Sequence, residues 1–186
     1  MLKFWVGLVV GVVLVPVAGM LYLFVGHPPV AVADHPFPFE RQIVKVPLHA
    51  RIRRDMPAAS PLQPTAANLT AGAQTYVQQC SACHGVKGHR SDFGPHMYPP
   101  APQLWYEHGN HGVVGVSDDP VGETYWKISN GIRLTGMPSY DRVLSATQMW
   151  QIALLLKSAN RPLPAGADAL LQPAPVAASG QSEGKK

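Results

Sequence analysis

Cysteine is scarce in this chain of 186 residues, which contains only Cys80 and Cys83. A framework of several disulfides and a structural zinc site made of four cysteines are therefore both excluded. Charged residues are also few, at 14% of the chain, and residues 66–160 carry six basic and six acidic side chains. A nucleic-acid-binding domain is expected to gather basic residues on its folded surface. We therefore expect no nucleic-acid partner.

The sequence also lacks a convincing set of strands and shows no internal repeat. Between residues 66 and 160, three segments instead have apolar residues at helical spacing. The first ends near Cys80 and has Asn68 or Thr70 as its expected N-cap. The second follows Asp119 and stops at Gly131, and the third begins with a capping box of Ser145 and Gln148. This pattern predicts a small all-α domain over residues 66–160.

A long apolar run lies at the N-terminus, where residues 4–25 contain no charged side chain. As a helix this run is about 33 Å long, enough for a hydrocarbon core of about 30 Å, so we predict a transmembrane anchor over residues 1–25. The alternative is a secretory signal cleaved after Ala33, although its apolar region is longer than the usual 7 to 15 or so residues. Lys3 precedes the run and no basic residue follows it before Arg41, which places the N-terminus in the cytoplasm and the remainder across the membrane.

Two flanking segments have the composition of linkers. Residues 26–65 are rich in proline and alanine and are predicted to be a tether, with QIVKVPL (42–48) as an alternative strand on a partner's sheet edge. The basic residues Arg51, Arg53 and Arg54 are expected to be solvated, or else to touch lipid head groups or a partner. Residues 161–186 contain too few large apolar side chains for a core, so we predict a disordered tail.

The two cysteines belong to the segment Cys80-Ser81-Ala82-Cys83-His84. A Cys-x-x-Cys pair serves as a redox dithiol, as half of a zinc site or as a haem attachment point. The first two uses give His84 no role, zinc lacks a second pair of cysteines, and the βαβ pattern of a thioredoxin-like site is missing. Haem attachment uses all three side chains, because the thiols join the porphyrin and the histidine ligates the iron. We predict one covalently attached haem c.

The opposite axial position of the iron decides what such a haem does. Six downstream side chains are candidates for it, namely Met97, His96, His108, His111, Met137 and Met149. Met137 is favoured because Gly136 before it permits an unusual turn and Pro138 after it stiffens the loop. Met149 falls on the apolar stripe of the last helix and is expected in the core.

These motifs resemble those of the class I c-type cytochromes, in particular the bacterial monohaem domains. The resemblance covers about residues 66–160 and is carried by CxxCH at 80–84 and GIRLTGMP at 131–138, with PPAPQL at 99–104 and MWQIALLLK at 149–157. It implies a fold of three main helices around the haem. It further implies that Cys80 and Cys83 are the thioether sites, His84 the proximal ligand and Met137 the distal ligand.

The resemblance also implies two structural details. The first and last helices are expected to cross, with Gly72 and Tyr76 on one and Trp150 on the other at the crossing. A proline carbonyl is expected to accept the N–H of the proximal histidine, and four prolines qualify, Pro95, Pro99, Pro100 and Pro102.

One segment departs from the family pattern. WYEHGNHGVVGVSDDP (105–120) is long and holds His108 and His111, which would form a copper or zinc site if they shared a helical turn. The intervening Gly109 and Asn110 favour a loop with exposed histidines instead.

A haem with both axial positions filled by protein exchanges single electrons and has no place for a substrate. We therefore expect a membrane-anchored monohaem cytochrome c on the periplasmic side of a bacterial inner membrane, an electron carrier rather than an enzyme. Its partners would be a quinol-level complex or dehydrogenase as donor and a terminal oxidase or reductase as acceptor. The protein would meet them either as a free carrier or as a subunit of a respiratory complex. The alternative is a haem enzyme or gas sensor in which Met137 is displaced.

Overall fold

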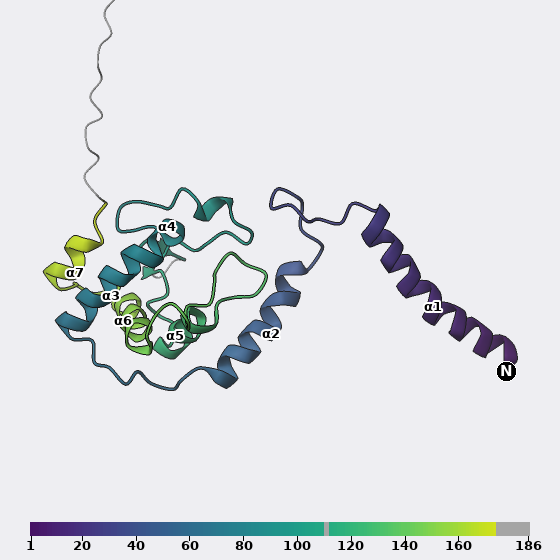
Figure 1. Ribbon diagram of the computed structural model, residues 1–186, viewed down its shortest axis with the longest axis horizontal. Helices are drawn as coiled ribbons and strands as arrows, with labels where there is room; N and C mark the ends of the chain where they lie inside the picture. Colours follow the sequence, from purple (N-terminus) through teal and green to yellow (C-terminus); the bar gives the residue numbers. More distant parts are fainter. Residues whose placement is uncertain (110–111, 174–186) are drawn as a thin grey trace, which may run out of the picture. The chain divides into compact units, whose positions relative to one another are not determined.

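The computed structural model describes residues 1–109 and 112–173, drawn in colour in Figure 1. The chain divides into two compact units, residues 1–43 and 44–186. The second unit is mostly helical, which confirms the predicted fold class. The element order is α1, α2, α3, α4, a 3₁₀ turn η1, β1, β2, α5, α6 and α7.

The first unit is dominated by α1 (Leu2–Val25), which has no buried residue. Among the described residues it is the one helix long and apolar enough to cross a membrane. A secretory signal shares these properties, so the helix suits both alternatives raised by the sequence. The helix includes Pro16 and ends at Gly26, whose N–H donates to the Tyr22 carbonyl at 2.8 Å.

The segment expected to be a tether contains α2 (Glu40–Asp55), so the linker prediction is wrong for these residues, and QIVKVPL is helical rather than a strand. Val44, Leu48 and Ile52 recur every four residues and form one apolar stripe along the helix. Ile52 is 1% exposed, and burial of this side chain stabilises a helix that Pro47 in its interior opposes.

Three helices build the second unit as predicted, with small differences at their ends. They are α3 (Ala66–Gln79), α5 (Val121–Asn130) and α6 (Ala146–Lys157). The N-cap of α3 is Thr65 rather than Asn68 or Thr70, because the Thr65 hydroxyl accepts the Asn68 N–H. The capping box of α6 and the glycine stop of α5 at Gly131 are both present.

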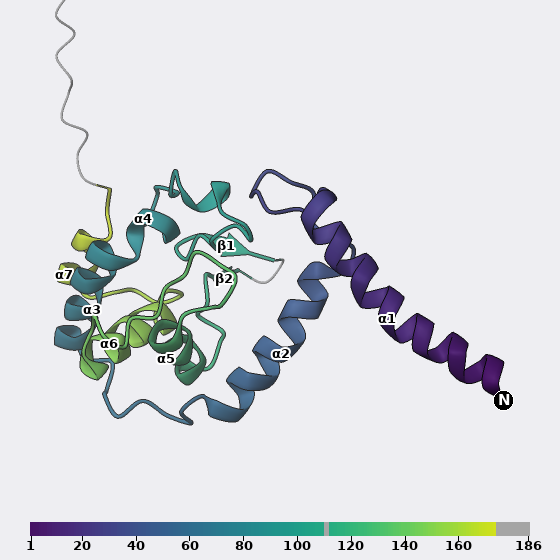
Figure 2. The same cartoon turned by 45° about the vertical axis from the view of Figure 1, so that its right-hand side comes forward.

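Helix α3 packs on α6, and α5 packs on the other side of α6 (Figures 1 and 2). A methyl group at Gly72 would come within 2.7 Å of the Gln151 carbonyl carbon, so glycine allows the two backbones to approach closely. Tyr76 is fully buried on α3. Trp150 stacks on Tyr125 of α5, with ring centroids 4.0 Å apart, which places its ring against α5.

The remaining short elements connect these helices. They are α4 (Ser81–His84), η1 (Gly94–His96) and an antiparallel pair of β1 (Glu107–His108) and β2 (Val113–Val114). Asn160, just after α6, holds this pair in place, since its side-chain oxygen accepts the N–H of Val114 at 2.7 Å.

The C-terminal segment differs from the predicted disordered tail, because residues Ala165–Leu170 form helix α7 on α3. Ala167 and Leu171 have no exposed surface. The Lys87 backbone N–H donates to the Leu171 carbonyl at 3.0 Å. The burial of Ala167 and Leu171, the ion pair of Lys87 with Asp168 and this backbone hydrogen bond together hold the segment in place. The part of the predicted tail beyond residue 173 lies outside the described residues.

Candidate haem site

The cysteine segment lies at the junction of α3 and α4. Cys80 is the C-cap of α3 and the N-cap of α4, so both thiols and His84 fall within one helical turn. Gly85 then ends this turn with φ of 71°, and a side chain there would come within 2.7 Å of the His89 carbonyl oxygen. The Tyr76 hydroxyl donates to the Gly85 carbonyl at 2.8 Å, which ties the turn back to α3.

Two further side chains hold the carbonyl groups of this turn. Gln103 donates its amide N–H to the Cys83 carbonyl at 3.2 Å and accepts the Ser91 N–H at 2.7 Å. The Ser91 hydroxyl donates to the Ala82 carbonyl. Sequence reasoning missed both residues. Gln103 lies in the segment PPAPQL that was noted for its family likeness, but nothing in the sequence indicated which backbone groups it binds.

His84 is oriented by a proline carbonyl, as expected, and the structure selects Pro102 from the four candidates. The His84 Nδ1 lies 2.8 Å from the Pro102 oxygen. Because a carbonyl oxygen only accepts hydrogen bonds, Nδ1 carries the proton, and the lone pair of Nε2 remains available for a metal. Burial lowers the pKa of His84, and the hydrogen bond to Pro102 opposes that shift. The neutral imidazole is the form that ligates a metal.

Met137 lies in a loop that closes on itself. The Ile132 N–H donates to the Met137 carbonyl at 3.2 Å, and the Met137 N–H donates to the Thr135 hydroxyl at 3.1 Å. Gly131 at the start has φ of 67°, and a side chain there would come within 2.7 Å of the Ser139 nitrogen. The backbone around the thioether is therefore held by its own hydrogen bonds and close contacts.

Tyr140 connects this loop to the cysteine segment. Its hydroxyl donates to the Gln79 carbonyl at 2.9 Å, one residue before Cys80. Its backbone N–H donates to the Ile128 carbonyl on α5 at 3.1 Å. The loop of Met137 and the turn of His84 are thus linked through one side chain that the sequence analysis did not single out.

A cavity lies between these elements. Its walls come from α3, α4, α5, α6 and the two loops, and its lining includes Cys80, Cys83, His84, Met97, Thr124, Lys127, Ile128, Met137, Tyr140, Ile152 and Leu156. Both cysteines are free thiols. Burial, with a smaller effect of Cys83, raises the pKa of Cys80 to about 12. Two free thiols, an oriented imidazole and a thioether on one largely apolar cavity are a donor set that fits a covalent haem.

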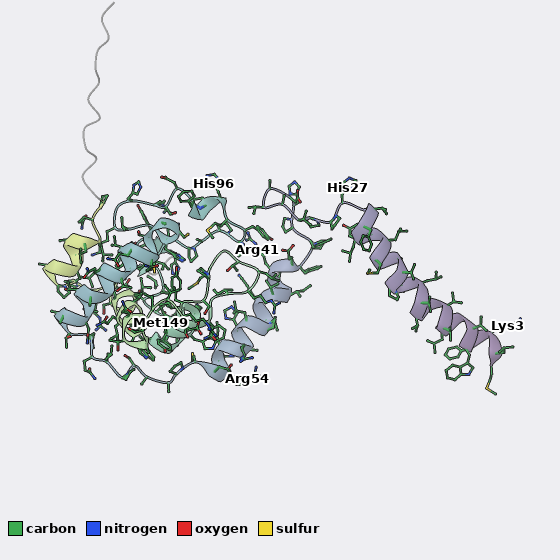
Figure 3. The ribbon with its side chains drawn as sticks, in the orientation of Figure 1. Lys3, His27, Arg41, Arg54, His96 and Met149 are labelled. Atoms are coloured by element: carbon green, nitrogen blue, oxygen red, sulfur yellow. The ribbon has the colours of Figure 1, made fainter. Side chains whose placement is uncertain are left out.

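Of the other candidates for the distal ligand, one shares the cavity with Met137. Met97 also lines the cavity, with its methyl group against Gly136. His96 is exposed on η1, and Met149 is 4% exposed in the core, as expected (Figure 3). His108 bonds through Nε2 to the Gly115 carbonyl. His111 lies outside the described residues, so the idea of a metal site with His108 stays untested.

The cavity wall carries one cation, which is paired with two carboxylates. Lys127 on α5 lines the cavity, and its amine lies 2.7 Å from Glu123 and 3.3 Å from Asp119. Two carboxylates around one amine leave a local excess of one negative charge, although residues 66–160 as a whole are neutral.

Residues 67–156 match the protein-family model described as "Cytochrome C oxidase, cbb3-type, subunit III". The matched range begins one residue into α3 and ends one residue before the end of α6, so it contains the whole cavity described above. No curated protein matches the chain.

Proposed function

Because residues 67–156 form a cytochrome c domain of the cbb3-type oxidase subunit III family, we propose that this protein transfers single electrons through one covalently attached haem c. Cys80 and Cys83 would hold the group by thioether bonds, with His84 and Met137 as its axial ligands. The haem supplies a reversible one-electron change of iron charge when bound. The protein supplies attachment, ligation and exclusion of water.

The orientation of His84 is the observation that supports this proposal most directly. The hydrogen bond of Nδ1 to Pro102 leaves only Nε2 for a metal, and the turn that carries His84 is held by Gln103 and Tyr76. A dithiol redox site would not need a histidine fixed in this way. Met137, held in a closed loop on the same cavity, provides the soft sulfur ligand that favours a high reduction potential.

The partners follow from the family and from the anchor. The family model describes an oxidase subunit, so we propose a terminal oxidase or reductase as the acceptor and a quinol-level complex or dehydrogenase as the donor. With α1 retained as an anchor, residues after Gly26 would lie on the periplasmic side of a bacterial inner membrane. Anchoring raises the effective concentration of partners, which compensates for the weak charge steering of a neutral domain.

The first test is the absorption spectrum of the membrane-bound protein, oxidised and reduced, with and without carbon monoxide. We expect a c-type haem spectrum that carbon monoxide does not change, because both axial positions are filled. In Met137→Ala we expect rapid carbon monoxide binding and a lower reduction potential, since the thioether that favours ferrous iron is lost.

Two matched variants make this test specific. Met149→Leu removes a buried sulfur of the core and Met97→Leu removes the second thioether on the cavity, and both should keep the unmutated response. If Met97→Leu rather than Met137→Ala opens the iron, the ligand assignment is wrong. Rapid carbon monoxide binding to the unmutated protein would instead support the haem enzyme or gas sensor.

Purification in mild detergent distinguishes a fixed subunit from a free carrier. A stoichiometric oxidase partner would support the subunit, and its absence would support the carrier. The intact mass of the same preparation shows whether the chain keeps its first 33 residues, as the anchor requires.

A further inference from the structure

The positive charge of the chain is concentrated on α2. This helix carries five basic and two acidic side chains, a net charge of +3, whereas residues 66–160 are neutral. The whole chain has a net charge of +4. Electron transfer by the haem domain does not explain why the excess positive charge lies on α2.

The packing of α2 determines which side of the helix faces solvent. Ile52 is buried, and Leu48, one turn earlier on the same stripe, is partly buried. On the opposite side, Val46, Ala50 and Arg54 recur at intervals of four residues and all are exposed, with Val46 at 70%. The outward stripe is therefore apolar in its first half and basic at its end, where Arg54 lies (Figure 3).

The cations at that end are only partly neutralised. Asp55 is shared by Arg51 and Arg54, and its oxygen lies 3.4 Å from the Arg54 Nε. Arg53 is exposed beside them. Three arginines and one carboxylate in residues 51–55 leave a local excess of positive charge. Guanidinium groups bind phosphate oxygens in pairs of hydrogen bonds.

The connection to α1 keeps this stripe near a membrane. Fourteen residues, 26–39, separate the end of α1 from the start of α2. A flexible segment of this length has a root-mean-square span of about 20 Å, so α2 stays close to the surface that α1 enters. Basic segments next to a membrane helix are attracted by anionic lipids, and exposed apolar side chains add burial in the headgroup region.

From these observations we infer that the outward stripe of α2 (Val46, Ala50 and Arg54), with Arg53 on its flank, binds the anionic headgroups of the membrane crossed by α1. This inference goes beyond the proposed electron transfer and rests on α1 being retained as an anchor. Contact with the bilayer would hold one side of the haem domain toward the membrane and leave its other surfaces for redox partners.

The test uses the full holoprotein in lipid nanodiscs with an environment-sensitive thiol dye at Ala50→Cys, since Cys80 and Cys83 are consumed by haem attachment. Discs contain either phosphatidylcholine alone or phosphatidylcholine with one third phosphatidylglycerol, each with brominated acyl chains as quenchers. We expect clear quenching in the anionic discs and little in the neutral ones. Salt near 1 M, where the Debye length is about 3 Å, should remove the difference.

Paired charge variants make the test specific. Arg53→Gln with Arg54→Gln should reduce quenching to the level of neutral discs. The control pair Arg142→Gln with Arg161→Gln removes the same charge from exposed positions outside α2 and should leave quenching unchanged. Equal quenching in both lipids, or equal effects of the two double variants, would overturn the inference. The haem spectrum of each preparation reports separately on the proposed electron transfer.

Discussion

Gly72 lies where α3 and α6 approach most closely, and its replacement by alanine tests the frame of the cavity. The new methyl group would come within 2.7 Å of the Gln151 carbonyl carbon and 3.2 Å of the Ile152 nitrogen, where an ordinary contact is at least 3.4 Å. Both neighbours are backbone atoms of a packed helix and cannot rotate away. The helices must therefore separate by most of an ångström, beside Tyr76 and Ile152 of the cavity wall.

Two opposing effects set the size of the change. Forcing an extra methyl group into a packed interior costs about 1–3 kcal/mol, and we expect the upper end because backbone meets backbone. The better helix propensity of alanine stabilises the helix by about 1 kcal/mol relative to glycine. The net loss of unfolding free energy is about 2 kcal/mol, equivalent to a decrease in Tm of roughly 10 °C for a domain of this size.

The assay is thermal unfolding of the holoprotein, followed by far-ultraviolet circular dichroism and by the haem absorption band. Gly166→Ala on α7 is the matched control, because its methyl group would lie 3.4 Å from Thr70, an ordinary contact. We expect its Tm to stay within the range of a typical surface substitution, equivalent to about 0.5 kcal/mol. A Gly72→Ala protein as stable as the unmutated one would refute the close approach of the two helices.

Three further predictions follow from single contacts. Tyr140→Phe removes the hydrogen bond to the Gln79 carbonyl, which should lower the unfolding free energy by about 1 kcal/mol. It should also raise the rate at which carbon monoxide binds to the reduced protein. An unchanged rate would show that this bond does not restrain the methionine loop. Lys87 lowers the pKa of Asp168 below its usual value of 3.8. Their ion pair should therefore stabilise the fold above pH 3.8 and lose this effect as the pH falls through the lowered pKa. Asp168→Asn should remove this part of the pH dependence of unfolding by urea. The same dependence of stability on pH in Asp168→Asn and the unmutated protein would contradict the ion pair. Ile52→Ala should make α2 more sensitive to limited proteolysis while the haem spectrum stays the same, and unchanged cleavage would mean that Ile52 does not dock the helix.

Much of the haem site was readable from short segments because their chemistry is local. Cys80, Cys83 and His84 lie next to one another whatever the remainder of the chain does, and the role of His84 with the lack of other cysteines argued against zinc and a redox dithiol. The loop of Met137 was recognisable for a similar reason, since its glycines permit tight turns and Pro138 restricts the backbone after the methionine. Their roles in ligation stay predictions until the spectra are measured.

The flanking segments were misjudged for a physical reason. Pro47 and a polar composition opposed a helix at residues 40–55, but α2 buries Ile52 and pairs Arg51 with Asp55, contributions that the linker-like composition did not indicate. Residues 165–170 have too few apolar side chains to fold alone, and they form α7 because α3 offers a surface for Ala167. Local propensity is a weak predictor where a neighbouring element supplies the burial.

By itself the sequence predicted the attachment chemistry, and it determined the three main helices with the capping box of α6 and the apolar N-terminal helix, because each depends on residues close together in the chain. Only the tertiary structure decided which proline orients His84, which side chain links the methionine loop to α3, and which side of α2 faces outward. Those choices join residues far apart in sequence, such as His84 with Pro102 and Tyr140 with Gln79. They depend on how the backbones pack, which no short segment encodes.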